Sequence, residues 1–143
     1  MPKEKRGSRF TLTVSSISVI LLLGACADLV VTRVHHEPFT GSQRQIKATV
    51  KNEGSRNAPA STTRVEVKPA GSTTFTRSAV ASTPALAPGQ EIELPVSGLS
   101  PTELPASGSG QCLELRACAD SEDAVQEGWL GEGNNCTTSS TCQ

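Results

Sequence analysis

The sequence predicts an all-β domain of about seven short antiparallel strands, arranged as a sandwich or a barrel. Aliphatic and polar residues alternate with a period of two in several segments after residue 26, which is the pattern of half-buried strands. Turn-forming residues separate these segments, and four cysteines near the C-terminus have the symmetric spacing of a hairpin. No segment after residue 26 has a convincing helical period.

Each expected strand has aliphatic side chains on one face and polar side chains on the other, as where one face of a sheet meets a core. The first strand is expected to begin at Leu29, and a weaker, threonine-rich strand is expected around Thr73 to Val80. The clear period-two segments are residues 45–51, 64–68, 91–96 and 113–117. Turn residues fall between them at 52–55, 69–72 and 87–89, and residues 101–110 form a loop rich in Pro, Ser and Gly.

The four cysteines after residue 26 predict a β-hairpin closed by two disulfides. Directly opposed residues of an antiparallel pair have numbers with a constant sum, and Cys112/Cys142 has the same sum as Cys118/Cys136. One register therefore places both pairs face to face. An even number of cysteines in an exported chain is typical of a disulfide framework, and the spacing differs from that of structural zinc sites. Cysteines and leucines alternate along the first arm, so both disulfides are expected on the outer face of the sheet.

Residues 1–26 are expected to be a signal peptide with a lipobox-like end, and residues 27–143 to be the folded domain. Four basic residues precede an apolar run at 10–23. This run is too short and too polar to cross a bilayer as a helix, which needs roughly 20 apolar residues. An export signal is therefore the better interpretation.

Two cleavage sites remain open in this segment. The sequence Leu-Gly-Ala-Cys at 23–26 resembles a bacterial lipobox, in which Cys26 is lipidated and becomes the mature N-terminus. Alternatively, the small residues on either side of Cys26 form a small-x-small site, and the mature chain begins at Asp28. Lipidation would leave little tether between the lipid and the strand that is expected to begin at Leu29.

Composition argues against nucleic-acid binding and against catalysis. Four of the 13 basic residues and one of the 14 acidic residues lie in the first 26 positions, so the remainder has nine basic and thirteen acidic residues and a net charge of −4. It has no basic stripe and few aromatic residues, so no nucleic-acid partner is expected. The sequence also lacks a nucleophile elbow, a phosphate-binding loop and a dinucleotide-binding glycine motif, so we expect no enzyme and no cofactor.

Four short motifs occur in the order in which a known family has them. They are DLVV at 28–31, VKNEG at 50–54, LAPG at 86–89 and EGNN at 132–135. Through them the chain resembles, from Asp28 to Thr141, the CARDB domain, the cell-adhesion-related domain found in bacteria. The resemblance implies an Ig-like antiparallel β-sandwich of about seven strands with a non-enzymatic surface or binding role, and it carries over no catalytic residues. The four cysteines depart from the usual pattern of such domains.

The loop between the two cysteine-bearing strands contains the candidate binding residues. Its acidic residues offer the oxygen ligands that Ca²⁺ prefers. Their spacing is not that of an EF-hand, so a solvated acidic turn is the favoured interpretation and no metal is favoured. Trp129, between glycines in this loop, is a candidate contact for a partner; the alternative is that it folds back onto the sandwich. The acidic candidates are Asp120, Glu122, Asp123, Glu127 and Glu132.

These observations together predict a non-catalytic binding or adhesion module. We expect it to be exported to the bacterial cell envelope, either held at the outer membrane or in the periplasm by a lipid on Cys26, or secreted freely. Its expected partner is an envelope or extracellular protein or glycan. The alternatives are a small secreted inhibitor that presents the disulfide-stapled loop to a protease, and a Ca²⁺-dependent binding domain.

Overall fold

The computed structural model describes residues 26–37, 45–99, 110–127 and 133–142, and these residues form an all-β domain with no helix. Seven strands are present, and all but the fourth occupy the segments in which the sequence predicts them, which confirms the predicted fold class. They are β1 (Leu29–Glu37), β2 (Gln45–Asn52), β3 (Ser61–Pro69), β4 (Arg77–Thr83), β5 (Glu91–Val96), β6 (Cys112–Cys118) and β7 (Cys136–Cys142).

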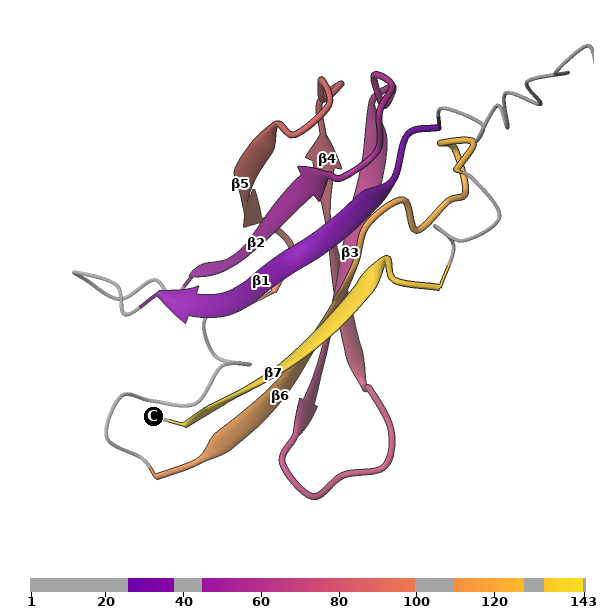
Figure 1. Ribbon diagram of the computed structural model, residues 1–143. Coiled ribbons are helices and arrows are strands. Elements are labelled where there is room, and N and C mark those ends of the chain that lie inside the picture. Colours follow the sequence, from indigo (N-terminus) through magenta and orange to yellow (C-terminus); the bar gives the residue numbers. More distant parts are fainter. Residues whose placement is uncertain (1–25, 38–44, 100–109, 128–132, 143) are drawn as a thin grey trace, which may run out of the picture.

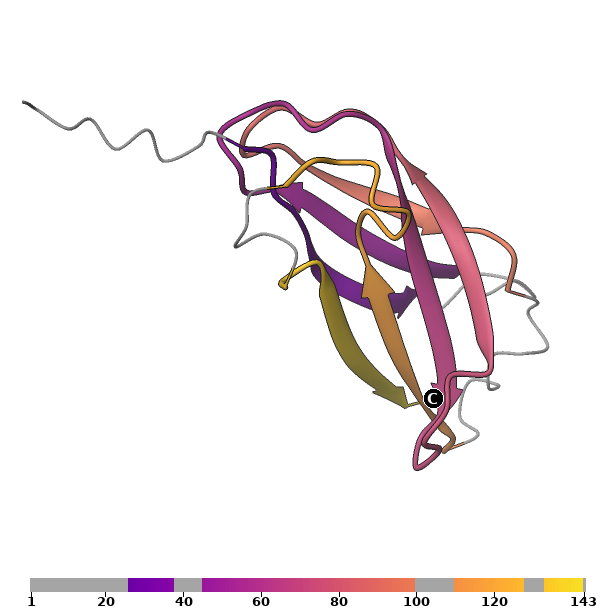
Figure 2. The same cartoon turned by 90° about the vertical axis from the view of Figure 1, so that its right-hand side faces the viewer.

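The strands form two antiparallel sheets that face each other as a sandwich (Figures 1 and 2). One sheet has the order β1-β2-β5 and the other the order β4-β3-β6-β7. Every strand pair within the sheets is antiparallel. Strands β1 and β7 lie at the edges of their sheets and run on the same side of the sandwich (Figures 1 and 2).

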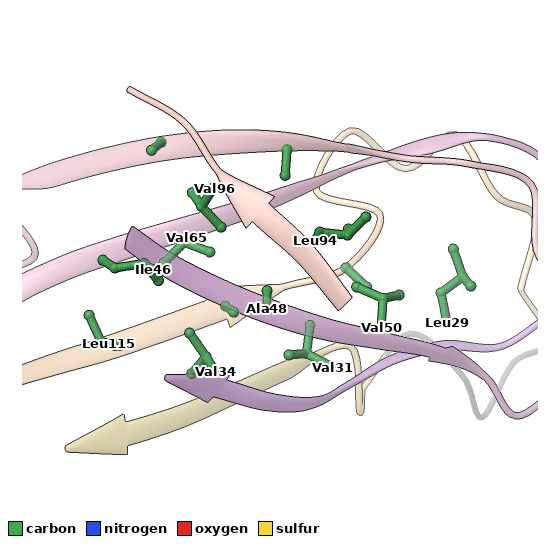
Figure 3. Close-up of a cluster of buried hydrophobic side chains, with 14 of the residues drawn as sticks. Leu29, Val31, Val34, Ile46, Ala48, Val50, Val65, Leu94, Val96 and Leu115 are labelled. Carbon is green, nitrogen blue, oxygen red and sulfur yellow. The ribbon is translucent and has the colours of Figure 1, made fainter. Parts of the chain in front are cut away.

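The core lies between the sheets and is built from the aliphatic residues that the period-two pattern marks (Figure 3). In β6, for example, Leu113, Leu115 and Ala117 are buried, whereas the residues between them are half-buried on the outer face. The buried apolar residues among those described are all Val, Leu, Ile or Ala. This core therefore has small side chains and leaves much of the stability of the domain to hydrogen bonds and cross-links.

The prediction for the fourth strand is wrong in its position: β4 spans Arg77–Thr83, not Thr73 to Val80. Residues 70–76 instead form the connection from β3, in which the Ser72 amide donates to the Pro69 carbonyl at 3.0 Å. Phe75 in this connection packs over the outer face of the sheet, with the Arg116 guanidinium 4.4 Å from its ring centre. The turn geometry and this contact outweigh the strand preference of the threonines.

The side chain of Asn52 joins three segments that are far apart in the sequence. It is fully buried, and its Oδ1 accepts hydrogen bonds from the amides of Asp28 (3.2 Å) and Gly54 (3.0 Å). Its Nδ2 donates to the carbonyls of Arg56 (2.7 Å) and Leu86 (3.0 Å). Asn52 thus uses both its acceptor and its donor group to hold the start of β1, the turn after β2 and the loop before β5 together.

Gly54 is the residue at which this junction leaves no room for a side chain. A Cβ at this position would lie 2.3 Å from the Cys26 carbonyl oxygen and 2.6 Å from the Asp28 nitrogen. Both are backbone atoms, which cannot turn aside as the end of a side chain can. The close approach fixes residues 26–28 against the turn after β2.

Candidate binding surface

Asp120 forms a turn at the start of the acidic loop and is not available as a ligand. It is buried, and its two carboxylate oxygens accept hydrogen bonds from the amides of Ala124 (2.9 Å) and Val125 (2.8 Å). Its φ of 46° lies in the left-handed region, which Asp tolerates better than most residues. Val125, which is only 1% exposed, anchors the turn in the core.

Glu127 ties the other end of this turn to the start of β1. Its side chain is buried, and its Oε1 accepts a hydrogen bond from the Leu29 amide at 2.7 Å. Residue 127 also forms a parallel bridge with Ala27. The buried carboxylate therefore satisfies the backbone donor of the first residue of β1.

The remaining acidic candidates that the structure describes, Glu122 and Asp123, do not complete a cation site. Glu122 and Asp123 are exposed, and the Glu122 carboxylate accepts a hydrogen bond from the Thr62 hydroxyl at 3.3 Å. Glu132 and Trp129 lie outside the residues that the structure describes. Within the described part of the chain, no three His, Cys, Asp or Glu side chains are grouped so that they could hold a metal ion. Among the described residues of the loop, Ala119, Val125 and Glu127 are buried against the domain.

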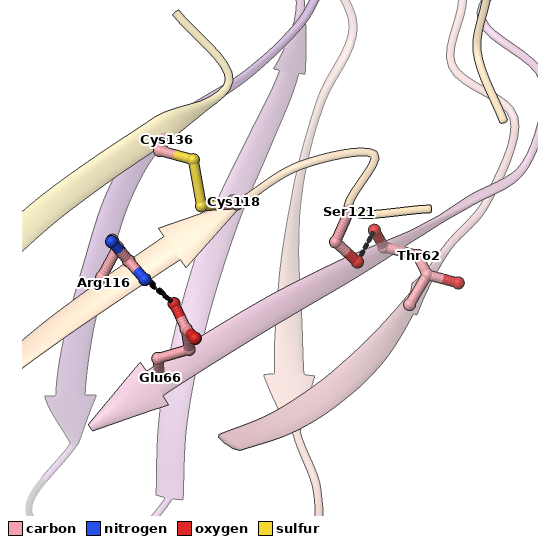
Figure 4. The surroundings of a disulfide bond; sticks show 6 residues. All are labelled: Thr62, Glu66, Arg116, Cys118, Ser121 and Cys136. Atoms are coloured by element: carbon pink, nitrogen blue, oxygen red, sulfur yellow. Dashed lines mark hydrogen bonds and ion pairs between the residues drawn. A yellow bond between two sulfur atoms is a disulfide. The ribbon is translucent and has the colours of Figure 1, made fainter. Parts of the chain in front are cut away.

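The two disulfides join Cys112 to Cys142 and Cys118 to Cys136, in the register that the spacing predicts. Both lie on the outer face of the four-stranded sheet, because the alternate residues of β6 point into the core. Next to them the Arg116 guanidinium donates to the Glu66 carboxylate on β3 (Figure 4). The bridges therefore clip β6 to β7 and do not cross between the sheets.

A charged network that the sequence analysis does not predict covers the outer face of the three-stranded sheet. The Lys47 ammonium on β2 lies 2.8 Å from the Glu93 carboxylate on β5 and 2.9 Å from the Glu37 carboxylate on β1. The His35 ring nitrogen Nε2 lies 3.8 Å from Glu93. Alternation alone places these residues on outer faces, but only the strand order β1-β2-β5 brings them together.

Hydrogen bonding within this network shifts the pKa values of its members. The hydrogen bond from Lys47 lowers the pKa of Glu93 below its ordinary value, and the hydrogen bonds with Glu93 and Glu37 raise the pKa of Lys47. A lowered carboxyl pKa stabilises the fold above the ordinary pKa of the group, and this stabilisation is lost as the pH falls through the lowered value. Glu93 is exposed and Lys47 is half-buried at the surface, so solvent screens the pair and the effect on the free energy of unfolding is small.

A bulge in β1 opens a hollow beside this network. The register between β1 and β2 shifts between Val31 and Arg33, so that the consecutive residues Thr32 and Arg33 are both exposed. The hollow has a volume of about 400 Å³. The Thr32 hydroxyl donates to the Glu91 carboxylate across it at 3.3 Å. Bulges often re-aim side chains beside functional sites, and here the bulge directs a cation and a hydroxyl group outwards. The lining residues are Thr32, Arg33, Thr49, Glu91, Ile92 and Glu93.

Cys26 lies at the end of the sandwich where β1 begins, and its backbone is part of the fold. Its carbonyl accepts hydrogen bonds from the amides of Ser55 (2.9 Å) and Arg56 (3.3 Å), and the next residue, Ala27, is 5% exposed. The Cys26 thiol is free of disulfides. The described residues contain no helix that is long and apolar enough to cross a membrane.

Comparison with known proteins gives a family match over most of the chain. The family model named CARDB matches residues 26–139. None of the curated proteins matches the sequence.

Solved structures of CARDB domains and related modules share the fold. One is the crystal structure of the CARDB domain of a Pyrococcus furiosus protein in complex with di-metal ions, which is 24% identical. Its TM-score is 0.54, and the match covers 82% of this chain and 94% of that one. Another is the solution structure of a domain from a Methanosarcina acetivorans protein that is provisionally assigned to the cell surface, with 18% identity and a TM-score of 0.53. That match covers 82% of this chain and 92% of that one.

Proposed function

Because the chain belongs to the CARDB family, we propose that it is a non-catalytic binding module of the cell envelope, exported and anchored by a lipid on Cys26. The observation that carries the binding function is the bulge of β1, which exposes Thr32 and Arg33 beside a hollow on the outer face of the three-stranded sheet. The cell-surface assignment of the Methanosarcina acetivorans relative supports the location.

The partner that best fits this surface is an envelope or extracellular protein with an acidic side chain for Arg33. Charges on the rim of the surface are already arranged in pairs, such as Lys47 with Glu93, so the face has a fixed pattern of positive and negative groups. Such a pattern favours partners with the complementary pattern and repels others. A glycan partner is the competing outcome.

The proposed function does not include the metal binding that is described for the Pyrococcus furiosus structure. The described residues offer no group of three metal-binding side chains, and both oxygens of Asp120 are occupied by backbone amides. The donor set among these residues does not fit a di-metal centre, so binding is proposed to be independent of metal.

Lipidation of Cys26 is supported by the way in which residues 26–28 are built into the domain. Cleavage before Cys26 leaves its carbonyl hydrogen bonds and the buried Ala27 in place. Cleavage after Ala27 would remove both and would leave the charged α-amino group at Asp28, next to the buried Asn52. The absence of a tether means that a lipid on Cys26 would hold this end of the sandwich directly at the membrane surface.

The anchor is tested by mass spectrometry of the mature protein from the cell that exports it. We expect an N-terminal peptide that begins at Cys26 and carries the mass of the acyl chains, and its loss in Cys26→Ser. A mature chain that begins at Asp28, or an unmodified Cys26, would show that the protein is secreted without a lipid.

The binding surface is tested by a charge reversal at the bulge. We expect Arg33→Glu to abolish the capture of the partner from an envelope extract, because it removes the outward cation from the hollow. The matched control is Arg64→Glu, which makes the same charge change at an exposed position of the other sheet. If both variants capture the same proteins as the wild type, the partner does not bind at the bulge; capture that a soluble glycan abolishes would assign the surface to glycans.

A further inference from the structure

The outer edge of β7 is open along its whole length among the residues that the structure describes. The sheet order β4-β3-β6-β7 places β7 at the border, and β6 is the only described strand that pairs with it. The yellow strand at the border of the sandwich in Figures 1 and 2 is this element. An edge strand presents a row of unpaired N–H and C=O groups, which is a template for pairing with another chain.

The geometry of the disulfides shows which backbone groups face outwards. The Cα atoms are 4.0 Å apart in both disulfide pairs, the short separation of a pair that exchanges no hydrogen bonds between its strands. The adjacent pair agrees, since the Ala119 amide donates to the Asn135 carbonyl at 2.9 Å. Hydrogen-bonded and non-bonded pairs alternate along an antiparallel ladder. The even-numbered residues of β7 therefore direct their N–H and C=O groups away from β6; they are Cys136, Thr138, Ser140 and Cys142.

The other three sheet edges are protected against pairing. A bulge and the exposed Arg33 interrupt β1, and β5 is short, charged and contains Pro95. The outer side of β4 is bridged at Val80 by Ser97. Bulges, prolines and charges are the devices with which proteins block edge pairing. Strand β7 has no charged residue, no proline and no bulge.

The sequence of β7 is close to symmetric about Ser139. An antiparallel pairing of two copies about this residue places Thr137 opposite Thr141 and Thr138 opposite Ser140. No like charges meet, and hydroxyl-bearing residues face one another, which is a favourable class of cross-strand pair. In this register the even-numbered residues of one copy face even-numbered residues of the other, so the outward N–H and C=O groups pair with each other.

From this register we propose that β7 is a self-association edge, which pairs with β7 of a second copy about a two-fold axis at Ser139. The four-stranded sheets of both copies then form one continuous sheet, and the contact is closed because each copy uses the same surface. Backbone hydrogen bonds supply most of the affinity, as in other cases of strand addition. The pairing does not involve the hollow at the β1 bulge or the lipid on Cys26, so it stands apart from the proposed function.

The proposal is tested by analytical ultracentrifugation of the processed protein over a range of concentrations. The wild type is expected to shift from monomer to dimer as its concentration rises. Ser140→Pro is expected to remain monomeric at concentrations where the wild type is dimeric. The proline removes an outward N–H that β6 does not use, and proline is tolerated on edge strands. Thr138→Lys, which adds the charge that natural edges carry, is expected to have the same effect.

Two controls separate loss of pairing from loss of folding. Thr76→Lys adds the same charge at an exposed position outside β7 and is expected to dimerise as the wild type does. The thermal unfolding midpoint of both edge variants should match that of monomeric wild type. A wild type that stays monomeric at every soluble concentration overturns the proposal, and so does a dimer that persists in both edge variants, since that dimer would use another surface.

Discussion

Replacing Asn52 by alanine is expected to lower the free energy of unfolding by roughly 3 kcal/mol or more, because a single side chain satisfies four backbone groups. The bond to the Leu86 carbonyl is buried, and that carbonyl retains a second donor in the Ala58 amide. The amides of Asp28 and Gly54 lose their acceptor at a partly buried junction. A loss of this size is a large part of the 5–15 kcal/mol that is typical of a small domain.

Urea unfolding of the wild type and of Asn52→Ala measures the effect. Asn57→Ala is the matched control, since it removes the same side chain from an exposed position in the connection after β2 and is expected to change the midpoint little. Asn52→Asp separates acceptor from donor: it retains the oxygens that accept from Asp28 and Gly54 but cannot donate to Arg56 and Leu86. If Asn52→Ala unfolds at the same urea concentration as Asn57→Ala, the side chain does not stabilise the junction.

Removing the disulfide between Cys118 and Cys136 is expected to cost about 3 kcal/mol, since the bridge closes a loop with a sequence separation of 18 residues. The physical reason is the larger conformational entropy of the unfolded chain once the bridge is absent. The effect is large here because the core consists of small aliphatic side chains. The bridge between Cys112 and Cys142 lies outside the bridge between Cys118 and Cys136 and adds only two short strand segments to the loop that is already closed. Its removal alone is therefore expected to cost somewhat less.

The double variant Cys118→Ala/Cys136→Ala tests this in urea, with Cys112→Ala/Cys142→Ala as the comparison. Both should unfold at lower urea concentrations, the first more than the second. The slope of the transition should rise as well, because an unfolded chain with fewer cross-links exposes more surface. A wild type whose midpoint does not move after reduction of both bridges would show that hydrogen bonding and the core hold the sandwich without them.

The sequence identifies some residues of the candidate surfaces, but it does not show what their side chains contact. Asp120 and Glu127 stand out in the sequence as acidic residues of one loop, yet the fold uses their carboxylates to hold backbone amides. Lys47 and Glu93 look like ordinary solvent-facing residues of separate strands, yet they form an ion pair at 2.8 Å. Sequence spacing does not show which strands are neighbours in a sheet. The charged face exists only because β1, β2 and β5 are neighbours.

The sequence by itself determined the local features of this protein. Alternation of polar and aliphatic residues located the strands, because a strand side chain must point either to the core or to water. The spacing of four cysteines determined the register of β6 against β7, because the numbers of opposed residues in an antiparallel pair have a constant sum. Only the tertiary structure decided the order of the strands, the position of β4, the burial of Asn52 and the hollow at the β1 bulge. Each of these depends on contacts between segments far apart in the chain, and their energies are set by packing and by backbone groups that no local pattern records.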